Sequence, residues 1–306
     1  MTLPRRALFL ASLLAGPGLV AMLAQGTPPP RPWVVAHRGA SAYAPENTVP
    51  AFSVAIEQGA TFVEFDIQRT KDGALVLLHD TTLERTTDVE QVFPDRGRRV
   101  QVKGEWRTQW PLADFTLAEV RRLDAGTWFG PHFAGTRVPT FAETVAAVKG
   151  RTGLFIELKS PERYPGIEAE VLSALRAAGL DQPWANPKTP VVLQSFTVGS
   201  LRILAALKTP LPIHLLFGPA DAATWTTGAG LADARTFVTG LSPDKQVVAA
   251  DPGLVARAHA HGMPVTPYTF RASSAPGAPD VRDEMRAAID RGIDGVITDN
   301  PDRVPR

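Results

Sequence analysis

The 306-residue sequence contains no cysteine and has no large excess of charge of either sign. The absence of cysteine excludes a disulfide framework, a thiolate metal site and a cysteine nucleophile. Lysine and arginine number 32 against 31 aspartate and glutamate residues, which argues against a strongly basic nucleic-acid binder. Hydrophobic residues make up 44% of the chain, as in a globular protein with a sizeable core. Carboxylates, hydroxyls and six histidines therefore remain as the groups that can carry chemistry.

The N-terminal stretch has the pattern of a secretory signal peptide. Arg5 and Arg6 precede residues 7–24, which contain no charged residue. The alternative is a retained anchor helix, since an apolar stretch of this length lies at the lower limit for spanning a bilayer. Glycine and proline in its middle weaken that helix. We expect residues 1–26 to be removed and residues 27–32 to form a proline-rich spacer. The mature protein would then be periplasmic or extracellular, without stable membrane insertion.

Short apolar runs alternate with helical patterns over the rest of the chain. The predicted strands are Trp33 to Ala36, Phe62 to Ile67, Leu154 to Leu158, Val191 to Ser195, Ile213 to Phe217, Gln246 to Ala250, Pro264 to Phe270 and Gly295 to Thr298. The predicted helices are Thr48 to Gln58, Thr140 to Val148, Ile167 to Ala178, Val198 to Leu207, Gly253 to His261 and Val281 to Arg291. This alternation favours an α/β fold, a closed (β/α)₈ TIM barrel in residues 33–306. An open doubly wound sheet is the alternative, although no glycine-rich dinucleotide loop follows the first strand.

A β-hairpin is predicted within the second barrel unit. The apolar run that starts at Phe62 reaches a second run at Leu75 through the turn residues 70–73. This connection is too short for a crossover helix, so the two runs should pair antiparallel. A turn at the centre of residues 70–73 would place Glu64 opposite His79.

Residues 81–115 follow the hairpin and show no clear periodicity. We interpret them as an insertion at the barrel mouth after the second strand; the alternative is a solvated surface loop without a role. Their basic side chains are Arg96, Arg98, Arg99, Lys103 and Arg107.

Carboxylates gather near the ends of two predicted strands, where barrel enzymes place their sites. Glu64 and Asp66 are two residues apart and therefore point to the same face, and so do Glu157 and Lys159. If both faces turn toward the barrel axis, each pair of like charges costs roughly 3 kcal/mol at ~5 Å in an effective dielectric of ~20. A divalent cation would offset this repulsion, and oxygen ligands without cysteine favour Ca²⁺ or Mg²⁺ over Zn²⁺. The alternative is a salt-bridge network in which Arg38 and Lys159 neutralise the acids without a metal.

Two histidines flank these acids. His37 ends the first strand and His79 ends the second arm of the hairpin, and both can exchange protons near neutral pH as a general acid and base. Arg38 and Lys159 add fixed positive charge that suits a phosphate group. Together these residues indicate metal-assisted phosphodiester cleavage, while spacing alone leaves phosphate monoester hydrolysis and metal-dependent sugar isomerisation open. The remaining histidines are interpreted as structural: His132, His214, His259 and His261.

A series of motifs spans almost the whole mature chain. They are His37-Arg38-Gly39-Ala40-Ser41, Pro45-Glu46-Asn47-Thr48, Glu64-Phe65-Asp66-Ile67-Gln68, Thr70-Lys71-Asp72-Gly73, His79-Asp80, Ile156-Glu157-Leu158-Lys159, Gln194-Ser195-Phe196 and Thr298-Asp299-Asn300-Pro301. With these motifs in this order, the sequence resembles the glycerophosphodiester phosphodiesterases. Residues 93–96 and 267–271 look closest to the periplasmic bacterial branch, although many relatives carry tryptophan at the position of Tyr268.

The resemblance implies a TIM-barrel enzyme that hydrolyses glycerophosphodiesters to glycerol 3-phosphate and an alcohol. In the chemistry proposed for the family, the glycerol 2-hydroxyl attacks phosphorus and expels the head-group alcohol, and water then opens the cyclic phosphate. By position, the resemblance implies these roles: His37 and His79 as general acid and base; Glu64, Asp66 and Glu157 as metal ligands, usually for Ca²⁺; Arg38 and Lys159 at the phosphate; Phe196 and Tyr268 as walls of the glycerol pocket; and Glu46 and Asn47 as braces of the first loop.

The sequence leaves three properties open: the head group, the histidine that acts first as base, and the oligomeric state. A lysophospholipase D-type phosphodiesterase acting on lysolipids would use similar residues. From another class, a non-catalytic barrel could bind a phosphate ligand, but it predicts the loss of a catalytic histidine or metal acid, and none is missing. The expected partner is a small-molecule substrate, and no nucleic-acid partner is expected.

Overall fold

The apolar runs form a ring of parallel strands in the computed structural model, which describes residues 31–183, 186–275 and 277–305. The predicted leader lies outside the described residues. The strands follow one another around the ring in the order β10-β1-β2-β6-β7-β8-β9. Most strand residues are buried, as in parallel sheets covered on both faces. The bounds are β1 Trp33–Ala36, β2 Phe62–Arg69, β6 Gly153–Leu158, β7 Val191–Ser195, β8 Ile213–Phe217, β9 Gly240–Pro243 and β10 Gly295–Thr298.

Residues 264–270 close the ring between β9 and β10. The backbone N–H of Leu241 donates to the Pro264 carbonyl at 2.8 Å on one side, and that of Phe270 donates to the Ile297 carbonyl at 2.9 Å on the other. Further backbone hydrogen bonds continue both pairings: the N–H of Thr266 donates to the Leu241 carbonyl at 2.8 Å, and that of Ile297 donates to the Pro267 carbonyl at 3.0 Å. The closed (β/α)₈ barrel is therefore confirmed, and the open-sheet alternative is wrong.

One predicted strand is wrong. Residues 246–250 lie in helix α9, Lys245–Ala250, and the barrel strand precedes them as β9. The Asp244 side chain caps this helix by accepting from the Gln246 N–H at 2.7 Å. A short apolar run is compatible with either a buried strand or a buried helical turn, and here the N-terminal cap stabilises the helix.

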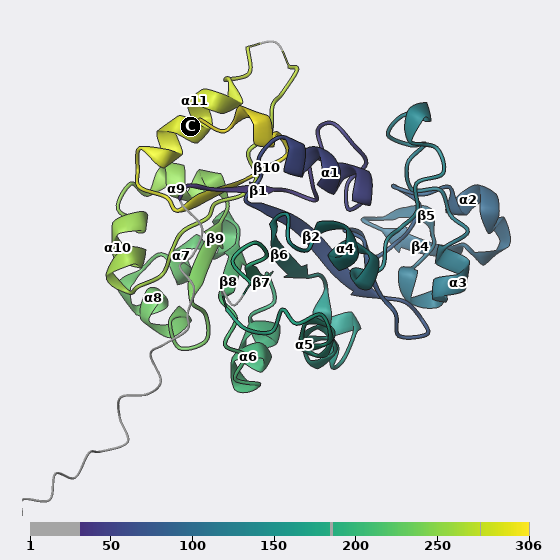
Figure 1. Ribbon diagram of the computed structural model, residues 1–306, viewed down its shortest axis with the longest axis horizontal. Helices are drawn as coiled ribbons and strands as arrows, with labels where there is room; N and C mark the ends of the chain where they lie inside the picture. The colour runs from purple at the N-terminus through teal and green to yellow at the C-terminus, as the bar shows by residue number, and fades with distance from the viewer. Residues whose placement is uncertain (1–30, 184–185, 276, 306) are drawn as a thin grey trace, which may run out of the picture.

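Helices cover the outside of the ring (Figure 1). Thr140 begins α4 with a capping box, since its side chain accepts from the Glu143 N–H while the Glu143 carboxylate accepts from the Thr140 N–H. Among the described residues no helix is long and apolar enough to cross a membrane. The bounds are α1 Val49–Glu57, α4 Phe141–Val148, α5 Ile167–Ala177, α6 Val198–Ala206, α7 Ala222–Trp225, α8 Gly228–Ala234, α10 Leu254–Ala260 and α11 Val281–Ile289. Short 3₁₀ helices are η1 Pro94–Arg96, η2 Leu112–Asp114, η3 Pro131–Phe133, η4 Pro161–Arg163, η5 Pro219–Asp221 and η6 Pro301–Arg303.

The predicted hairpin is present, but its register differs by one residue. Strand β2 pairs antiparallel with β3, Leu75–Leu77, and Ile67 lies opposite Leu77. This register would set Glu64 against Asp80 and not against His79. The cause is a turn centred on Asp72, whose carboxylate accepts from the Thr70 hydroxyl at 2.7 Å.

The insertion after the hairpin, residues 81–115, folds around an apolar core that it shares with the hairpin and with the residues that follow it. It contains α2 Val89–Val92, the hairpin of β4 Arg98–Val102 and β5 Glu105–Gln109, and, beyond residue 115, α3 Leu117–Val120. In Figure 1 these elements lie beside the barrel, on the side opposite α10. The segment is thus an ordered module and not a bare loop. The insertion contributes Leu83, Val89, Trp110, Leu112 and Phe115 to this core, the residues after it contribute Val120, Leu123, Ala125 and Val138, and the β2–β3 hairpin unit contributes Val76 and Leu78.

The barrel interior below the site is mostly apolar, and His214 is buried in it with its Nδ1 3.3 Å from the Ser242 hydroxyl. Aromatic rings pack edge to face there, with the centroids of Trp33 and Phe62 5.5 Å apart. His214 of β8 is buried among them, and its ring centroid lies 5.3 Å from that of Phe155. Glycine is required at position 240, because an added Cβ would lie 2.3 Å from His214 Nε2. The packed interior leaves the strand ends as the place for a site.

Candidate active site

The carboxyl ends of the strands surround a cavity of about 190 Å³ that holds most of the predicted site residues. His37 directly follows β1, and Lys159 directly follows β6. The predicted residues among its walls are His37, Arg38, Glu64, His79, Glu157, Lys159, Phe196 and Tyr268. Residues separated by more than 200 positions therefore meet in one place because parallel strands end at the same rim.

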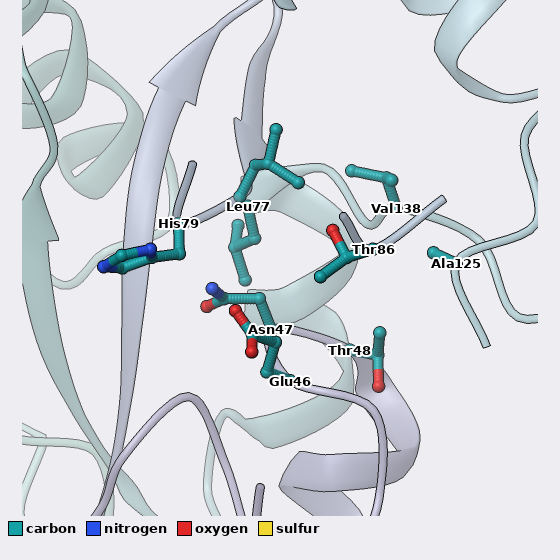
Figure 2. A pocket seen from close by; sticks show the side chains of 9 residues that line it. Glu46, Asn47, Thr48, Leu77, His79, Thr86, Ala125 and Val138 are labelled. Carbon is teal, nitrogen blue, oxygen red and sulfur yellow. The ribbon is translucent and has the colours of Figure 1, made fainter. Parts of the chain in front are cut away.

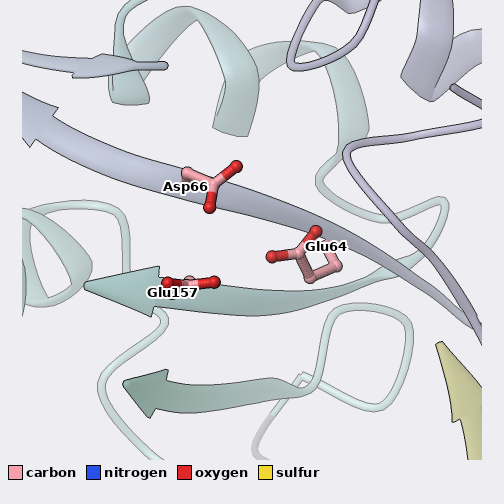
Figure 3. Close-up of side chains that lie close together, drawn as sticks. All are labelled: Glu64, Asp66 and Glu157. Carbon is pink, nitrogen blue, oxygen red and sulfur yellow. The ribbon is translucent and has the colours of Figure 1, made fainter. Parts of the chain in front are cut away.

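The three predicted metal ligands form a buried cluster at this rim. Glu64 and Asp66 of β2 are each 1% exposed, and Glu157 of β6 is 6% exposed. Each offers a carboxylate oxygen that lies within 4.8 Å of the other two (Figure 3). Among the acidic and histidine side chains of the described residues, these three carboxylates are the ones that lie close enough together to hold a metal ion.

Two cations also contact the cluster. Lys159 Nζ lies 2.9 Å from Glu157 Oε1 and 3.4 Å from Asp66 Oδ1. Arg38 Nε lies 3.4 Å from Asp66 Oδ2. The salt-bridge network considered as the alternative to a metal is therefore present around Asp66.

The cations do not neutralise the whole cluster. Burial and then the charge of Asp66 raise the pKa of Glu64 well above its usual value, and the same causes raise the pKa of Glu157 to about 7. Burial acts on Asp66 as well, but Lys159 and Arg38 outweigh it and hold the Asp66 pKa well below its usual range. Three ionised carboxylates face only the two cations Arg38 and Lys159, so a negative charge is left uncompensated. The all-oxygen donor set and this uncompensated charge fit a divalent cation such as Ca²⁺ or Mg²⁺.

Each candidate catalytic histidine has a carboxylate on Nδ1. His37 Nδ1 lies 2.6 Å from Asp299 Oδ1, and His79 Nδ1 lies 2.6 Å from Asp80 Oδ1. Such contacts fix the tautomer and orient the ring, so that Nε2 is the nitrogen left for a substrate. Burial, followed by the charge of Arg38, lowers the pKa of His37, although the hydrogen bond to Asp299 opposes this shift.

The first loop links these groups through Glu46 and Asn47. Glu46 accepts from Arg38 at 2.9 Å and from Arg85 at 2.7 Å, and Arg85 also pairs with Asp80. Asn47 Nδ2 donates to Asp66 Oδ2 at 2.8 Å. The bracing expected of Glu46 and Asn47 thus has a direct basis in hydrogen bonds.

A small crevice marks the junction of this loop with the hairpin and the insertion. Figure 2 shows Glu46 and Asn47 beside Leu77 and His79, with Thr86 of the insertion and two residues that follow the insertion on the other side of the crevice. The two following residues are Ala125 and Val138. The insertion and the residues after it therefore meet the first loop and the hairpin close to His79.

Aromatic side chains form another wall of the cavity. The rings of Phe196 and Tyr268 meet edge to face, with centroids 5.5 Å apart. Phe196 is 45% exposed, and the Lys159 ammonium lies 5.6 Å from its ring centroid. An apolar wall beside the cations suits a substrate that carries both a phosphate and a carbon chain.

Sequence reasoning assigned no role to several residues at this site. Asp299, Asp80 and Arg85 orient or brace the histidines, while Gln194 and Arg271 line the cavity. Asp299 directly follows β10, so its place at a strand end was a usable signal. The role of Arg85 had no such signal, because it comes from the insertion.

Comparison with known proteins identifies the family of this chain. A family model described as the glycerophosphoryl diester phosphodiesterase family matches residues 37–303. A glycerophosphodiester phosphodiesterase of Bacillus subtilis is 32% identical over 90% of this chain and 85% of its own. One from Caldanaerobacter subterraneus is 33% identical over 88% of this chain and 94% of its own.

Solved structures of phosphodiesterases are also similar to this chain. A phosphodiesterase of Oleispira antarctica, determined in complex with the product sn-glycerol-3-phosphate, superposes with a TM-score of 0.69 at 27% identity and covers 89% of this chain and 95% of its own. A second structure, from Silicibacter pomeroyi, gives a TM-score of 0.68 at 26% identity, over 91% of this chain and 93% of its own. With a family match over nearly all of the barrel and the expected acids and histidines in one cavity, the chain belongs to the glycerophosphoryl diester phosphodiesterase family.

Proposed function

We propose that the protein hydrolyses glycerophosphodiesters to glycerol 3-phosphate and an alcohol with the help of a divalent cation. The observation that carries this proposal is the meeting of a buried carboxylate cluster, two histidine–aspartate pairs and two cations around one cavity. The solved relative with bound sn-glycerol-3-phosphate supports the choice of substrate class.

The phosphate would lie between the fixed positive charges of Arg38 and Lys159. Both side chains are largely buried and keep raised pKa values: burial opposes their charge, but Asp66 and the neighbouring glutamates outweigh it. They therefore stay charged at every physiological pH and compensate the phosphodiester anion. Glu64, Asp66 and Glu157 would hold Ca²⁺, with Mg²⁺ as the alternative. The bound cation would draw charge from the phosphate oxygens during cleavage.

The two histidines would move the protons. One imidazole Nε2 takes a proton from the attacking hydroxyl, and the other gives a proton to the oxygen of the departing head group. If the glycerol 2-hydroxyl attacks first, the same pair serves again when water opens the cyclic phosphate. Asp299 and Asp80 stabilise the positive charge that each ring acquires when protonated.

Phe196 and Tyr268 would wall the glycerol part of the substrate. Their edge-to-face pair presents apolar surface to the cavity. A single-chain lysolipid would instead need a path for its acyl chain past these rings.

Release of glycerol 3-phosphate from glycerophosphocholine tests the proposal. Activity should appear with Ca²⁺ or Mg²⁺, disappear with chelator and return when the cation is restored. Lysophosphatidylcholine assayed in parallel separates the lysophospholipase D-type alternative, and phosphate binding without turnover would indicate the non-catalytic barrel. Failure to hydrolyse any glycerophosphodiester with any divalent cation would show that the proposal is wrong.

We also propose that the protein acts outside the cytoplasm, as in the periplasmic branch that its sequence resembles. The basic start and the uncharged residues 7–24 support this. Expression of the full chain in a bacterial host, followed by N-terminal sequencing of the periplasmic fraction, tests it. Processing near residue 26 is expected, and exclusively unprocessed cytoplasmic protein would contradict export.

A further inference from the structure

The side chain of Gln194 holds an unusual position in the cavity. Gln194 lies in β7, in register with Glu157 of β6, and is 1% exposed. Its Nε2 donates to Glu64 Oε1 at 3.4 Å. Its Oε1 is buried and has no hydrogen-bond partner among the described residues. The same side chain lines the cavity that contains Glu64, Glu157 and Lys159.

A buried amide oxygen without a donor costs free energy, and structures rarely leave one in this state without a reason. The acids around Gln194 have no proton to give once they are ionised. The ammonium of Lys159, which lines the same cavity, is engaged by Glu157 and Asp66. Protein groups therefore do not satisfy this oxygen, but a cation among the carboxylates would.

We propose that Gln194 supplies its side-chain carbonyl oxygen to the cation site as a fourth protein ligand. The inference rests on the proposed metal dependence and extends its ligand set beyond Glu64, Asp66 and Glu157. Amide carbonyls are common ligands of Ca²⁺, which takes more oxygens than Mg²⁺. A neutral ligand also completes the site without adding a fourth negative charge to acids that already repel one another.

The competing explanation is that Gln194 only positions Glu64 through its Nε2–H. The two roles use opposite ends of the amide and therefore predict different behaviour for two variants. Gln194→Leu removes both the oxygen and the N–H donor. Gln194→Glu keeps an oxygen ligand but loses the donor and places a carboxylate next to Glu64.

Calorimetric titration of the purified chain with CaCl₂, without substrate, distinguishes these roles. Gln194→Leu should raise the dissociation constant for Ca²⁺ by about tenfold or more. Gln194→Glu should bind Ca²⁺ within a few-fold of the unmodified chain, or more tightly. Unchanged affinity in the leucine variant would overturn the inference, and so would an equal loss in both variants, because that pattern belongs to a positioning role.

Thr266→Val is the matched control. Thr266 is also fully buried in the barrel, and its Oγ1 also has no hydrogen-bond partner among the described residues, but it does not line the cavity. Its valine variant should keep the affinity for Ca²⁺. Circular dichroism and thermal unfolding in chelator verify that each variant is folded before titration.

The same titrations separate this inference from the proposed function. If the unmodified chain binds Ca²⁺ and the leucine variant binds it equally well, the role of Gln194 is wrong while the metal site stands. If the unmodified chain binds neither Ca²⁺ nor Mg²⁺, the metal site and the role of Gln194 fail together.

Discussion

Protonation of His214 should make the barrel sensitive to acid. Its ring is enclosed between Trp33 and Phe155, and its Nε2 has no hydrogen-bond partner among the described residues. Burial, with a smaller contribution from the charge of Arg31, lowers the pKa of His214 to about 3. The folded chain therefore keeps this imidazole neutral where an exposed imidazole is already charged.

The consequence for stability follows from proton linkage. An unfolded histidine titrates at a pKa of about 6.5. Between that pH and about pH 3, the His214 imidazole binds a proton in the unfolded chain but stays neutral in the folded chain. The free energy of unfolding is therefore highest above pH 6.5 and falls with falling pH, by up to about 1.4 kcal/mol per pH unit. Between about pH 7 and pH 4 the expected loss is about 3 kcal/mol from this residue alone.

Urea unfolding at pH 7 and pH 4 measures this loss. The His214→Leu variant lacks the titrating group, so its stability should fall by about 3 kcal/mol less than that of the unmodified chain over the same interval. The cost of changing a core side chain is present at both pH values and cancels. Replacing the exposed His132 with leucine is the control for the loss of one histidine. The same pH dependence in the His214 variant and the unmodified chain would refute the reasoning.

The remaining predictions concern the cavity. His37→Ala and His79→Ala should each lower kcat by about 100-fold or more in the glycerol 3-phosphate assay, and near-normal turnover in either would remove that residue from the mechanism. Asp299→Asn should lower kcat by at least about tenfold with little change in KM, since it no longer stabilises the charged ring of His37; a change in KM alone would contradict an orienting role. Glu64→Gln and Glu157→Gln should each weaken Ca²⁺ binding by about tenfold or more in calorimetry, whereas unchanged affinity would contradict the ligand assignment.

The closed barrel and the meeting of the site residues were predictable because they depend on strand order and strand ends. Once parallel strands are arranged in a ring, any ionisable residue at a carboxyl end faces the same rim. His37, Glu64 and Glu157 could be brought together on this basis without knowing any side-chain contact.

The errors arise where one local contact decides between two structures. Residues 246–250 were predicted as a strand, but the Asp244 cap stabilises them as part of helix α9. The hydrogen bond between Thr70 and Asp72 fixes a turn that shifts the hairpin register by one residue from the predicted one. Long-range partners were also missed. Arg85 reaches Glu46 from an insertion whose position depends on the apolar core that it shares with the hairpin, and no spacing rule in the sequence links Arg85 to Glu46.

The way in which the barrel closes separates two parts of the site that can change independently. The carboxylates lie on β2 and β6, which are joined by a continuous ladder over six residue pairs. Tyr268 lies on residues 264–270, whose backbone hydrogen bonds run to β9, to β10 and to the residues beside these two strands, and not to β2 or β6. Substitutions in that segment can reshape the substrate wall without disturbing the acids. Selection for a new head group would therefore act first on residues 264–270, and libraries that aim to alter the choice of substrate should start there.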